Sequence, residues 1–518
     1  MEVVNLDIFS LVNRDFNQLS ALNLEPFRRR WSSELGQMPK NSLILAAYLE
    51  VSGFQKAVPD KKLLDSLRTR KVRSLSGVMP FAVMTKPFHC PGECTYCPLE
   101  LGMPKSYLSD EPAAQRAKRV NFDPTAQMKM RLAQLALTGH NRDKIEVIII
   151  GGTFSAYPDD YRQQFIQSIF DTANGKKSST LVEAQKLNEI AKHRLVGLSV
   201  ETRPDWITPK EVRLYRQWGV TKIQMGVQAF DEKILRNIRR GHDLEAVARA
   251  TQMLRDSGFK VCYHLMPNLP GSTPRKDVAQ AKLMYRDPRF RPDYVKIYPC
   301  MVIPGTVLHK QWEKGEYRPY DDKRLKTALK EICALSPVWT RIDRLVRDIS
   351  KQWVSAGTLH TNMRQEIEQE LAAEGRPCRC IRCREVRQRT LERPKLSCRQ
   401  YQTWGGKECF LSFESEGKLY SLLRLRLPER DNPIFGELKN CAIIREVHTF
   451  GQALAVAGKP DKLVQHRGLG SLLVGRAEKI ARRYSYPKLA VIAAVGTRDY
   501  YRRFGFEVDG LYMTKNLC

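Results

Sequence analysis

Residues 88–98 read FHCPGECTYCP, and the three cysteines of this stretch, Cys90, Cys94 and Cys97, are spaced C-x3-C-x2-C. Three thiolates this close together can ligate three irons of a cubane [4Fe-4S] cluster and leave the fourth iron without a protein ligand. A closed zinc site would need a fourth ligand at a matching spacing, and disulfide pairing would need a fourth cysteine. Tyr96 inside the loop also favours the cluster, so the stretch predicts an iron-sulfur centre with one open iron.

This spacing is the one with which radical S-adenosylmethionine (SAM) enzymes hold their cluster. In those enzymes the methionine part of SAM chelates the open iron, and one electron cleaves SAM to a 5'-deoxyadenosyl radical. From about 76 to 335 the chain alternates short apolar runs with amphipathic stretches, which predicts an α/β fold: a parallel sheet curled into a partial TIM-like barrel. The six apolar runs are VMPFAVMT (78–85), KIEVIIIGG (144–152), HRLVGLSVE (193–201), TKIQMGV (221–227), KVCYHLMP (260–267) and DYVKIYP (293–299).

Three further regions flank the predicted barrel. Residues 1–75 combine helical periodicity with basic positions, and residues 336–400 form a basic, cysteine-rich linker. Residues 401–518 contain hairpin-like strands and one amphipathic helix, which predicts a second α/β domain.

Polar residues and glycines follow the predicted barrel strands, where a parallel barrel carries its active site. Glycines there let the backbone approach an amino-acid moiety, a carboxylate can bind ribose hydroxyls, and a guanidinium can bind a carboxylate. Taken alone, a glycine after a strand is more often just a turn, and a Glu or Arg at a strand end is more often a surface ion pair. Together, behind the cysteine loop, they predict a SAM pocket made by Gly151, Gly152, Thr153, Glu201, Arg203 and Gln228.

A second signature, Q-x-x-G-x-G, lies at Gln465, Gly468 and Gly470 and opens an amphipathic helix. Such a turn aims unpaired backbone N–H groups at a pyrophosphate, which suits coenzyme A, although it also matches helix N-termini in many proteins. The strand-like REVHTFG (445–451) comes before it, and VIAAVGTRDYYRRFGFE (491–507) after it resembles the closing strand and helix of GCN5-related acetyltransferases. That resemblance implies that Tyr500 or Tyr501 lies near the thioester sulfur.

A separate thiolate group, C-x-C-x2-C, is formed by Cys378, Cys380 and Cys383. Soft ligands at this spacing favour zinc, and a second iron-sulfur cluster is the alternative. The sequence leaves the fourth ligand open among Cys398, Cys409 and His360. Cys262, Cys300, Cys333 and Cys441 lie in apolar surroundings and are expected to be small core residues.

The formal net charge of +30 predicts a polyanionic partner. The basic residues gather at 27–31, 61–73 and 376–399 with aromatic residues between them, which favours RNA over a membrane, although a solvated basic face is the simpler alternative. The sequence has neither a charged-then-apolar leader nor an apolar run of membrane-spanning length. We therefore expect a cytoplasmic protein with reduced cysteines.

Several motifs together resemble the catalytic third subunit of Elongator in its bacterial or archaeal form, over residues 76–518. They are KPFHCPGECTYCP, SYLSDEPAAQRA, IIIGGTFSAYP, SVETRPD, QMGVQ, DYVKIYP, PCRCIRCREV, REVHTFG, QHRGLG and GTRDYYRRFGFE. Eukaryotic members have a longer loop between the first two cluster cysteines. The resemblance implies that the wobble uridine of tRNA is carboxymethylated at C5, after a 5'-deoxyadenosyl radical takes hydrogen from the acetyl methyl group of acetyl-CoA.

The resemblance also implies site residues and partners. Lys296 is a candidate for positioning the substrate, with a buried lysine paired to a carboxylate as the alternative. The expected partners are the tRNA anticodon stem-loop, bound in part by residues 1–75, and an external one-electron reductant. The residues expected to contact acetyl-CoA are Lys144, Glu446, Val447, His448, Leu469, Gly470, Ser471 and Tyr501.

Two other function classes remain open at this point. A protein lysine acetyltransferase would need only the C-terminal region and would leave the cysteine loop without a role. A radical SAM tRNA methylthiotransferase would need the loop and RNA but not the Q-x-x-G-x-G turn, and such enzymes usually have a second cysteine triad.

Overall fold

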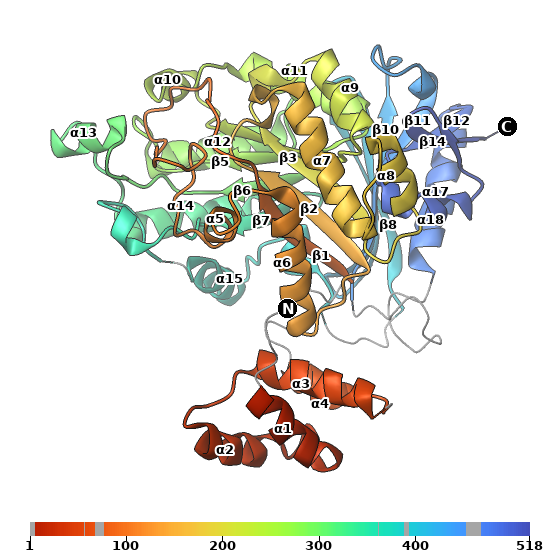
Figure 1. The fold of residues 1–518 in the computed structure, drawn as a ribbon. Helices are drawn as coiled ribbons and strands as arrows, with labels where there is room; N and C mark the ends of the chain where they lie inside the picture. The colour runs from red at the N-terminus through yellow and green to blue at the C-terminus, as the bar shows by residue number, and fades with distance from the viewer. Residues whose placement is uncertain are drawn as a thin grey trace.

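The computed structural model contains two seven-stranded sheets, and it describes residues 6–55, 57–67, 77–360, 362–387, 393–451 and 468–517. In the first sheet all strands are parallel and follow one another in chain order (Figure 1). The predicted parallel barrel sheet is therefore confirmed. Its strands are β1 (Val78–Met84), β2 (Lys144–Ile150), β3 (Arg194–Thr202), β4 (Lys222–Gln228), β5 (Lys260–Leu265), β6 (Tyr294–Ile297) and β7 (Arg341–Leu345).

The prediction of six strands is one strand short. The seventh strand, β7, pairs in parallel with β6 and lies in the range that the sequence predicts to be a linker. Within the described residues, β1 and β7 are the two edges of the sheet and do not pair with each other, so the barrel is open between them.

Helices connect the parallel strands and pack on the outer face of the sheet, as Figure 1 shows for α6 and α7. On β2, Ile145, Val147 and Ile149 are buried in the core beneath these helices. The connecting helices are α5 (Pro112–Lys118), α6 (Pro124–Leu137), α7 (Asp159–Asn174), α8 (Leu181–Asn188), α9 (Pro209–Gln217), α10 (Glu232–Asn237), α11 (Leu244–Asp256), α12 (Pro274–Arg286), α13 (Val307–Glu313) and α14 (Asp322–Ala334).

The alternate residues of the same strands point into the barrel, and many of them are polar. Side chains of a β-strand point to opposite faces in turn, so a run such as KIEVIII can pack apolar residues outward and place charge inside. The inward residues that line the interior include Lys144, Glu146, Lys222, Gln224, Lys260, His264, Tyr294, Lys296, Arg341 and Asp343.

The second sheet is mixed and belongs to the C-terminal region, drawn in blue in Figure 1. Its strand order is β13-β14-β12-β11-β10-β9-β8, and β8 begins before residue 401, within the predicted linker. The strands are β8 (Lys395–Thr403), β9 (Gly406–Ser415), β10 (Lys418–Pro428), β11 (Cys441–Thr449), β12 (Lys488–Val491), β13 (Glu507–Asp509) and β14 (Tyr512–Asn516). Helices α17 (Leu469–Arg483) and α18 (Arg498–Arg502) accompany them, and α15 (Met363–Ala373) and α16 (Ile381–Arg384) lie between the two sheets in the chain.

The second sheet packs against the amino ends of the barrel strands. Gly258, just before β5, lies so close to Ile443 and Ile492 that an added Cβ would be 3.2 Å from each. Arg445 on β11 donates a hydrogen bond to the backbone oxygen of Phe259 at 2.9 Å. The carboxyl ends of the barrel strands, which carry the cysteine loop, therefore lie at the opposite end from the second domain.

The N-terminal helices α1 (Leu6–Asp15), α2 (Leu24–Leu35), α3 (Asn41–Phe54) and α4 (Lys61–Leu67) have a core of their own. Figure 1 shows them as a separate group beside α6. Trp31, the aromatic residue at the end of the basic stretch 27–31, is fully buried in that core and donates a hydrogen bond to Asp15 at 2.8 Å, so it is not exposed to an RNA base. Within the described ranges, no helix has both the length and the apolar character needed to cross a bilayer.

Candidate functional site

One large cavity, of about 1930 Å³, runs through the barrel and reaches the second domain. At the carboxyl ends of the strands its lining includes Cys90, Cys94 and Cys97. At the amino ends it includes His448 and Gly470 of the second domain. The two signatures of the sequence, which lie more than 360 residues apart in the chain, therefore open into the same space.

The cysteine loop follows β1 and is anchored by backbone hydrogen bonds. Thr95 donates its N–H to the oxygen of Ile238, and the N–H of Leu308 is bonded to the oxygen of Thr95, both near 3 Å. The side chain of Lys105 donates to the backbone oxygen of Gly92. The three thiols are half-buried and have no disulfide partner, as a set of cluster ligands requires.

A buried arginine contacts this thiol group directly. Arg240 donates to the Sγ of Cys94 at 3.2 Å, and its Nε donates to the backbone oxygen of Gly226 at 2.9 Å. Burial alone would raise the pKa of Cys94, but the charge of Arg240 and its hydrogen bond outweigh burial and lower it. No motif in the sequence pointed to Arg240.

The predicted SAM residues lie together around the cysteine loop. Gly151 has a φ of +137°, and a Cβ there would collide with the Oγ1 of Thr85, so only glycine fits. Thr153 lies 3.8 Å from the Sγ of Cys90 through its Oγ1. Gly152, at a φ of +96°, lines the same part of the cavity.

Two buried polar atoms of this group have no protein partner. Arg203 holds Asp205 through two of its nitrogens, at 3.0 and 2.9 Å, but its buried Nη1 lies against the cysteine loop without a hydrogen bond. Gln228, which takes a left-handed backbone φ of +76°, likewise has a buried Oε1 without a donor. Unpaired buried polar atoms are rare in folded proteins, so their presence beside the loop fits a site that binds a polar ligand.

Glu201 connects this pocket to the barrel interior. One of its oxygens accepts a hydrogen bond from Tyr107 at 2.7 Å, and the other lies 3.6 Å from the Nζ of Lys296. Lys296 is therefore paired to a carboxylate and also lines the cavity. Both roles considered from the sequence, a buried ion pair and substrate positioning, are compatible with this place.

At the other end of the cavity, the predicted acetyl-CoA turn begins helix α17. Gly468 is the residue before the helix and has a φ of +68°, a conformation that favours glycine. A Cβ at Gly470 would lie 2.5 Å from the phenolic oxygen of Tyr500. Leu469 is buried and Ser471 is exposed to the cavity side, whereas Gln465 lies outside the described residues.

Glu446 and His448 on β11 face the same end of the cavity. Glu446 accepts hydrogen bonds from Tyr294 and, at 2.7 Å, from Arg424. Burial would raise the pKa of Glu446, but Arg424 and Lys260 hold it well below its usual range. The neighbouring Val447 is half-buried against the core of the second domain.

The remaining residues predicted near acetyl-CoA also line the cavity. Lys144 begins β2, and burial lowers its pKa. Tyr501 is only 6% exposed and packs in the apolar core of the second domain, and burial raises its pKa. Tyr500 is half-buried, so its phenol is the more accessible of the two.

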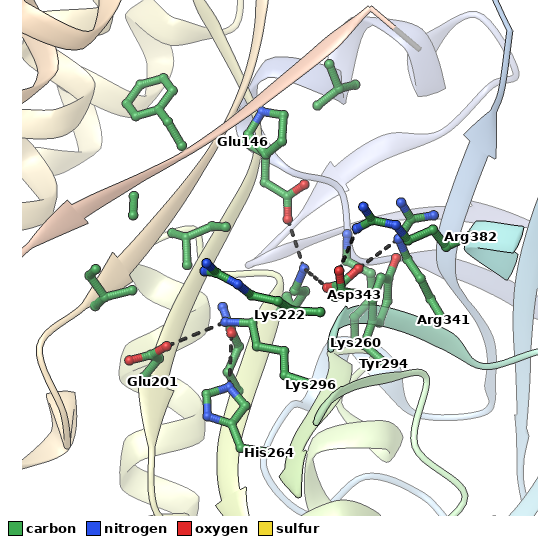
Figure 2. A pocket seen from close by; sticks show the side chains of 18 of the residues that line it. Glu146, Glu201, Lys222, Lys260, His264, Tyr294, Lys296, Arg341, Asp343 and Arg382 are labelled. Atoms are coloured by element: carbon green, nitrogen blue, oxygen red, sulfur yellow. Dashed lines mark hydrogen bonds and ion pairs between the residues drawn. The ribbon is translucent and has the colours of Figure 1, made fainter. Parts of the chain in front are cut away.

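Between the two ends, the barrel interior carries a network of charges that the sequence analysis did not single out. Figure 2 shows Glu146, Lys222, Asp343 and Arg341 pointing toward one another. Lys222 lies 3.2 Å from Glu146 and 3.7 Å from Asp343, which in turn pairs with Arg341 at 2.7 Å. One sign of this network in the sequence is a charged residue within a largely apolar strand, such as Glu146 in KIEVIII.

The second thiol group lies where β7 meets the second domain. The sulfur atoms of Cys378, Cys380 and Cys383 lie within 4.8 Å of one another, close enough to share one metal ion. Among the candidates for a fourth ligand, His360 is instead 3.4 Å from Glu366. Glu368 lies 3.4 Å from the Sγ of Cys383.

Comparison with known proteins gave consistent matches. The model of the Radical SAM superfamily matches residues 87–281, and that of the Radical_SAM C-terminal domain matches residues 292–373. A "tRNA uridine(34) acetyltransferase" of Dehalococcoides mccartyi is 43% identical over 454 residues, covering 86% of this chain and 99% of the relative. "Elongator complex protein 3" of Danio rerio is 37% identical and covers 96% of this chain and 93% of the relative. The structure of archaeal Methanocaldococcus infernus Elp3 with an N-terminal deletion is 37% identical, with a TM-score of 0.75, and covers 85% of this chain and all of that one.

Proposed function

This chain belongs to the family of the tRNA uridine(34) acetyltransferases and Elongator complex protein 3, and we propose that it modifies the wobble uridine of tRNA at C5 by radical SAM chemistry with acetyl-CoA as co-substrate. One observation carries the proposal beyond the family. The cysteine loop and the glycine turn before α17 line one cavity, as a reaction that needs both cofactors on one substrate requires.

The carboxyl end of the barrel fits a cluster and SAM. Cys90, Cys94 and Cys97 would hold a [4Fe-4S] cluster, which together with SAM supplies a 5'-deoxyadenosyl radical. Arg203, with its unpaired nitrogen, suits the SAM carboxylate, and Glu201 suits the ribose hydroxyls. Gly151, Gly152, Thr153 and Gln228 complete this pocket in the proposal.

The amino end fits acetyl-CoA. The backbone N–H groups in the first turn of α17 suit the pyrophosphate, and Gly468 and Gly470 keep the approach open. Tyr500 is the accessible phenol of the pair beside this turn, which supports it rather than Tyr501 as the group near the thioester. Acyl transfer to an amine needs no radical, so the shared cavity supports activation of the acetyl methyl group.

The charge of the cavity and of the chain supports an RNA substrate. Five arginines, from α6, β7 and the segments after β7, line the cavity and suit a phosphate-bearing substrate, although Arg341, Arg344 and Arg364 are also paired with carboxylates. They are Arg131, Arg341, Arg344, Arg364 and Arg382. The N-terminal helices would add a further contact to tRNA through their basic residues.

The proposal includes a structural zinc ion at Cys378, Cys380 and Cys383. Three buried or half-buried sulfur atoms this close are suited to a soft divalent ion. Arg364 donates to the Sγ of Cys383 at 3.8 Å, which places a positive charge beside the three sulfur atoms.

The test of the main proposal uses anaerobically reconstituted full-length protein, tRNA, SAM, a one-electron reductant and acetyl-CoA labelled in the acetyl group. We expect the label in a carboxymethyl group on the wobble uridine, together with 5'-deoxyadenosine, by mass spectrometry of nucleosides. Cys94→Ala and Gly470→Val should each abolish the product. The matched controls are Cys441→Ala, a buried cysteine of the second domain, and Gly475→Val, a glycine of α17 with open space around it.

Label on protein lysines, with full activity of the Cys94→Ala variant, would favour a protein acetyltransferase instead. Label-free methylthio-nucleosides would favour a methylthiotransferase.

A further inference from the structure

His264 on β5 presents an open hydrogen-bond acceptor to the cavity. The buried amide of Gln224 donates from Nε2 to Ser199 at 2.9 Å, and its Oε1 lies 3.3 Å from the Nε2 of His264. Because an amide oxygen can only accept, the Nε2 of His264 carries the ring proton and Nδ1 keeps its lone pair. Among the described residues no donor is bonded to that Nδ1, and the ring lines the cavity.

The surroundings keep this imidazole neutral. Burial lowers the pKa of His264 well below its usual value, and the charges of Lys296, Arg347, Arg240 and Lys222 lower it further. The ring therefore remains an acceptor at Nδ1 throughout the physiological pH range, in a space that is otherwise rich in donors.

A fixed donor stands beside this acceptor. Lys296 on β6 is the direct neighbour of His264 across the parallel strands, and both side chains point into the barrel (Figure 2). Burial would lower the pKa of Lys296, but Tyr298 and Glu201 outweigh it and raise it, so the ammonium group keeps its charge. The ammonium group has three N–H donors, and Glu201, at 3.6 Å, engages one of them. The others can bind a ligand.

A flat surface completes the arrangement. The ring of Tyr298 meets His264 edge to face, with 5.7 Å between the centroids, and is half-buried in the cavity wall. Aromatic side chains at such positions stack on bases that have been turned out of an RNA loop.

We propose, on the basis of the proposed function, that His264 and Lys296 form the subsite that reads the wobble base, with Nδ1 of His264 accepting the N3–H of uracil and Nζ of Lys296 donating to a ring carbonyl oxygen. This binding holds the base by its Watson–Crick edge. The C5–C6 edge, which lies across the ring from N3, then faces the open cavity, where C5 has to react.

The same pair of side chains rejects cytosine. Cytosine has a lone pair at N3 instead of a proton, so it would set an acceptor against the acceptor of His264 and leave both unpaired. Sites that hydrogen-bond a substrate N–H discriminate strongly against analogues that lack it. His264 is therefore a specificity-determining residue for uridine.

The test compares three anticodon stem-loop RNAs that differ only at the wobble position, which is uridine, cytidine or 3-methyluridine. Affinity is measured by fluorescence anisotropy at one salt concentration, and product formation is measured with the reconstituted full-length enzyme. We expect kcat/KM for uridine to exceed that for the other two by at least about 100-fold. His264→Phe, which keeps a ring but has no acceptor, should reduce the uridine rate and bring the ratio of uridine to cytidine below about 5.

His264→Gln restores a carbonyl acceptor and should recover part of the ratio. His309→Phe, a histidine of α13 outside the cavity lining, is the matched control and should behave as the unaltered protein. If His264→Phe does not fold, the 3-methyluridine RNA tests the same hydrogen bond with the unaltered protein.

Two results would overturn the subsite. Equal use of 3-methyluridine and uridine would mean that N3 has no acceptor. A loss of rate in His264→Phe that leaves the uridine-to-cytidine ratio unchanged, and removes one limb of the pH–rate profile, would make His264 a general base. If no RNA is modified at all, the proposed function fails, whereas the affinities still report on base recognition.

Discussion

The carboxylate of Asp293 accepts two hydrogen bonds of 2.7 Å from the guanidinium group of Arg445, and neither side chain has any solvent exposure. Asp293 immediately precedes β6 of the barrel, and Arg445 lies on β11 of the second domain. Arg424 adds a second guanidinium 3.3 Å away. Burial would raise the pKa of Asp293, but these two arginines outweigh burial and lower it. The two domains are therefore joined by a buried ion pair.

Asp293→Asn should strongly destabilise the fold, because it removes the carboxylate that two buried guanidinium groups share and leaves Arg424 with Glu446 and Arg445 with Glu408. We expect the free energy of unfolding to fall by about 3–5 kcal/mol, measured by denaturant titration. The double variant Asp293→Leu with Arg445→Met should be less destabilised than Asp293→Asn, since apolar residues can replace a buried pair. Glu245→Gln, in an exposed pair with Arg249, should change stability by no more than about 0.5 kcal/mol. If Asp293→Asn lowered the free energy of unfolding by no more than the Glu245→Gln control, the ion pair would not stabilise the fold.

Replacing Cys90, Cys94 and Cys97 together by alanine should abolish the cluster. The three sulfur atoms are the thiols at the carboxyl end of the barrel that line the cavity. Iron and sulfide analysis after anaerobic reconstitution checks this expectation. Cys441→Ala serves as the control and should keep a full complement of iron. A full cluster in the triple variant would disprove the assignment.

Arg240→Gln should lower the reduction potential of the cluster. A positive charge beside a cluster thiolate stabilises the reduced, more negative state, so its removal makes reduction harder. A loss of about 1.4 kcal/mol would correspond to about 60 mV for one electron. Redox titration followed by electron paramagnetic resonance measures the shift. Arg239→Gln, the exposed neighbouring residue, is the control, and an equal shift in both variants would count against a specific role for Arg240.

Cys380→Ser should release zinc and lower the melting temperature. The side chain is fully buried where the linker meets β7, so the effect should be on stability before it is on chemistry. Metal analysis of the purified protein, with Cys441→Ser as the control, gives the result. If the unaltered protein contains no zinc, the site is not a zinc site.

Glu146→Gln should destabilise the barrel in a pH-dependent manner. Burial would raise the pKa of Glu146, but Lys222 and Lys260 outweigh burial and lower it to about 2. A carboxyl group with a lowered folded-state pKa stabilises the fold above its unfolded value, near 4.5, and loses that contribution as the pH falls toward 2. The difference from the unaltered protein should be about 3 kcal/mol at pH 7 and should shrink below pH 4.5. A difference that is constant between pH 7 and pH 3 would contradict this reading.

The parts that could be predicted from sequence are those encoded by neighbouring residues. The cysteine loop and the glycine turn before α17 are local patterns, and the apolar runs predicted six of the seven barrel strands. Strand β7 was missed because its residues, RIDRL, alternate charge with apolar side chains and point that charge into the cavity.

The site residues that were missed depend on tertiary contacts. Arg240 is 146 residues away from Cys94 in the chain, so no local sequence pattern could predict their contact. Lys222 and Asp343 meet only because the parallel strands bring their inward positions to one space. The basic stretch at 27–31 was misleading in one respect, since Trp31 serves the helical core and not an RNA base.

The cavity that joins both ends of the barrel also bears on the order in which the reactants load. SAM would enter at the carboxyl ends of the strands and acetyl-CoA at the amino ends, so neither has to pass the other, and the base would approach between β1 and β7. Spent coenzyme A can then exchange for fresh acetyl-CoA without displacing SAM or the RNA. Initial-rate kinetics with SAM and acetyl-CoA should accordingly follow a random sequential scheme, in which neither cofactor competes with the other.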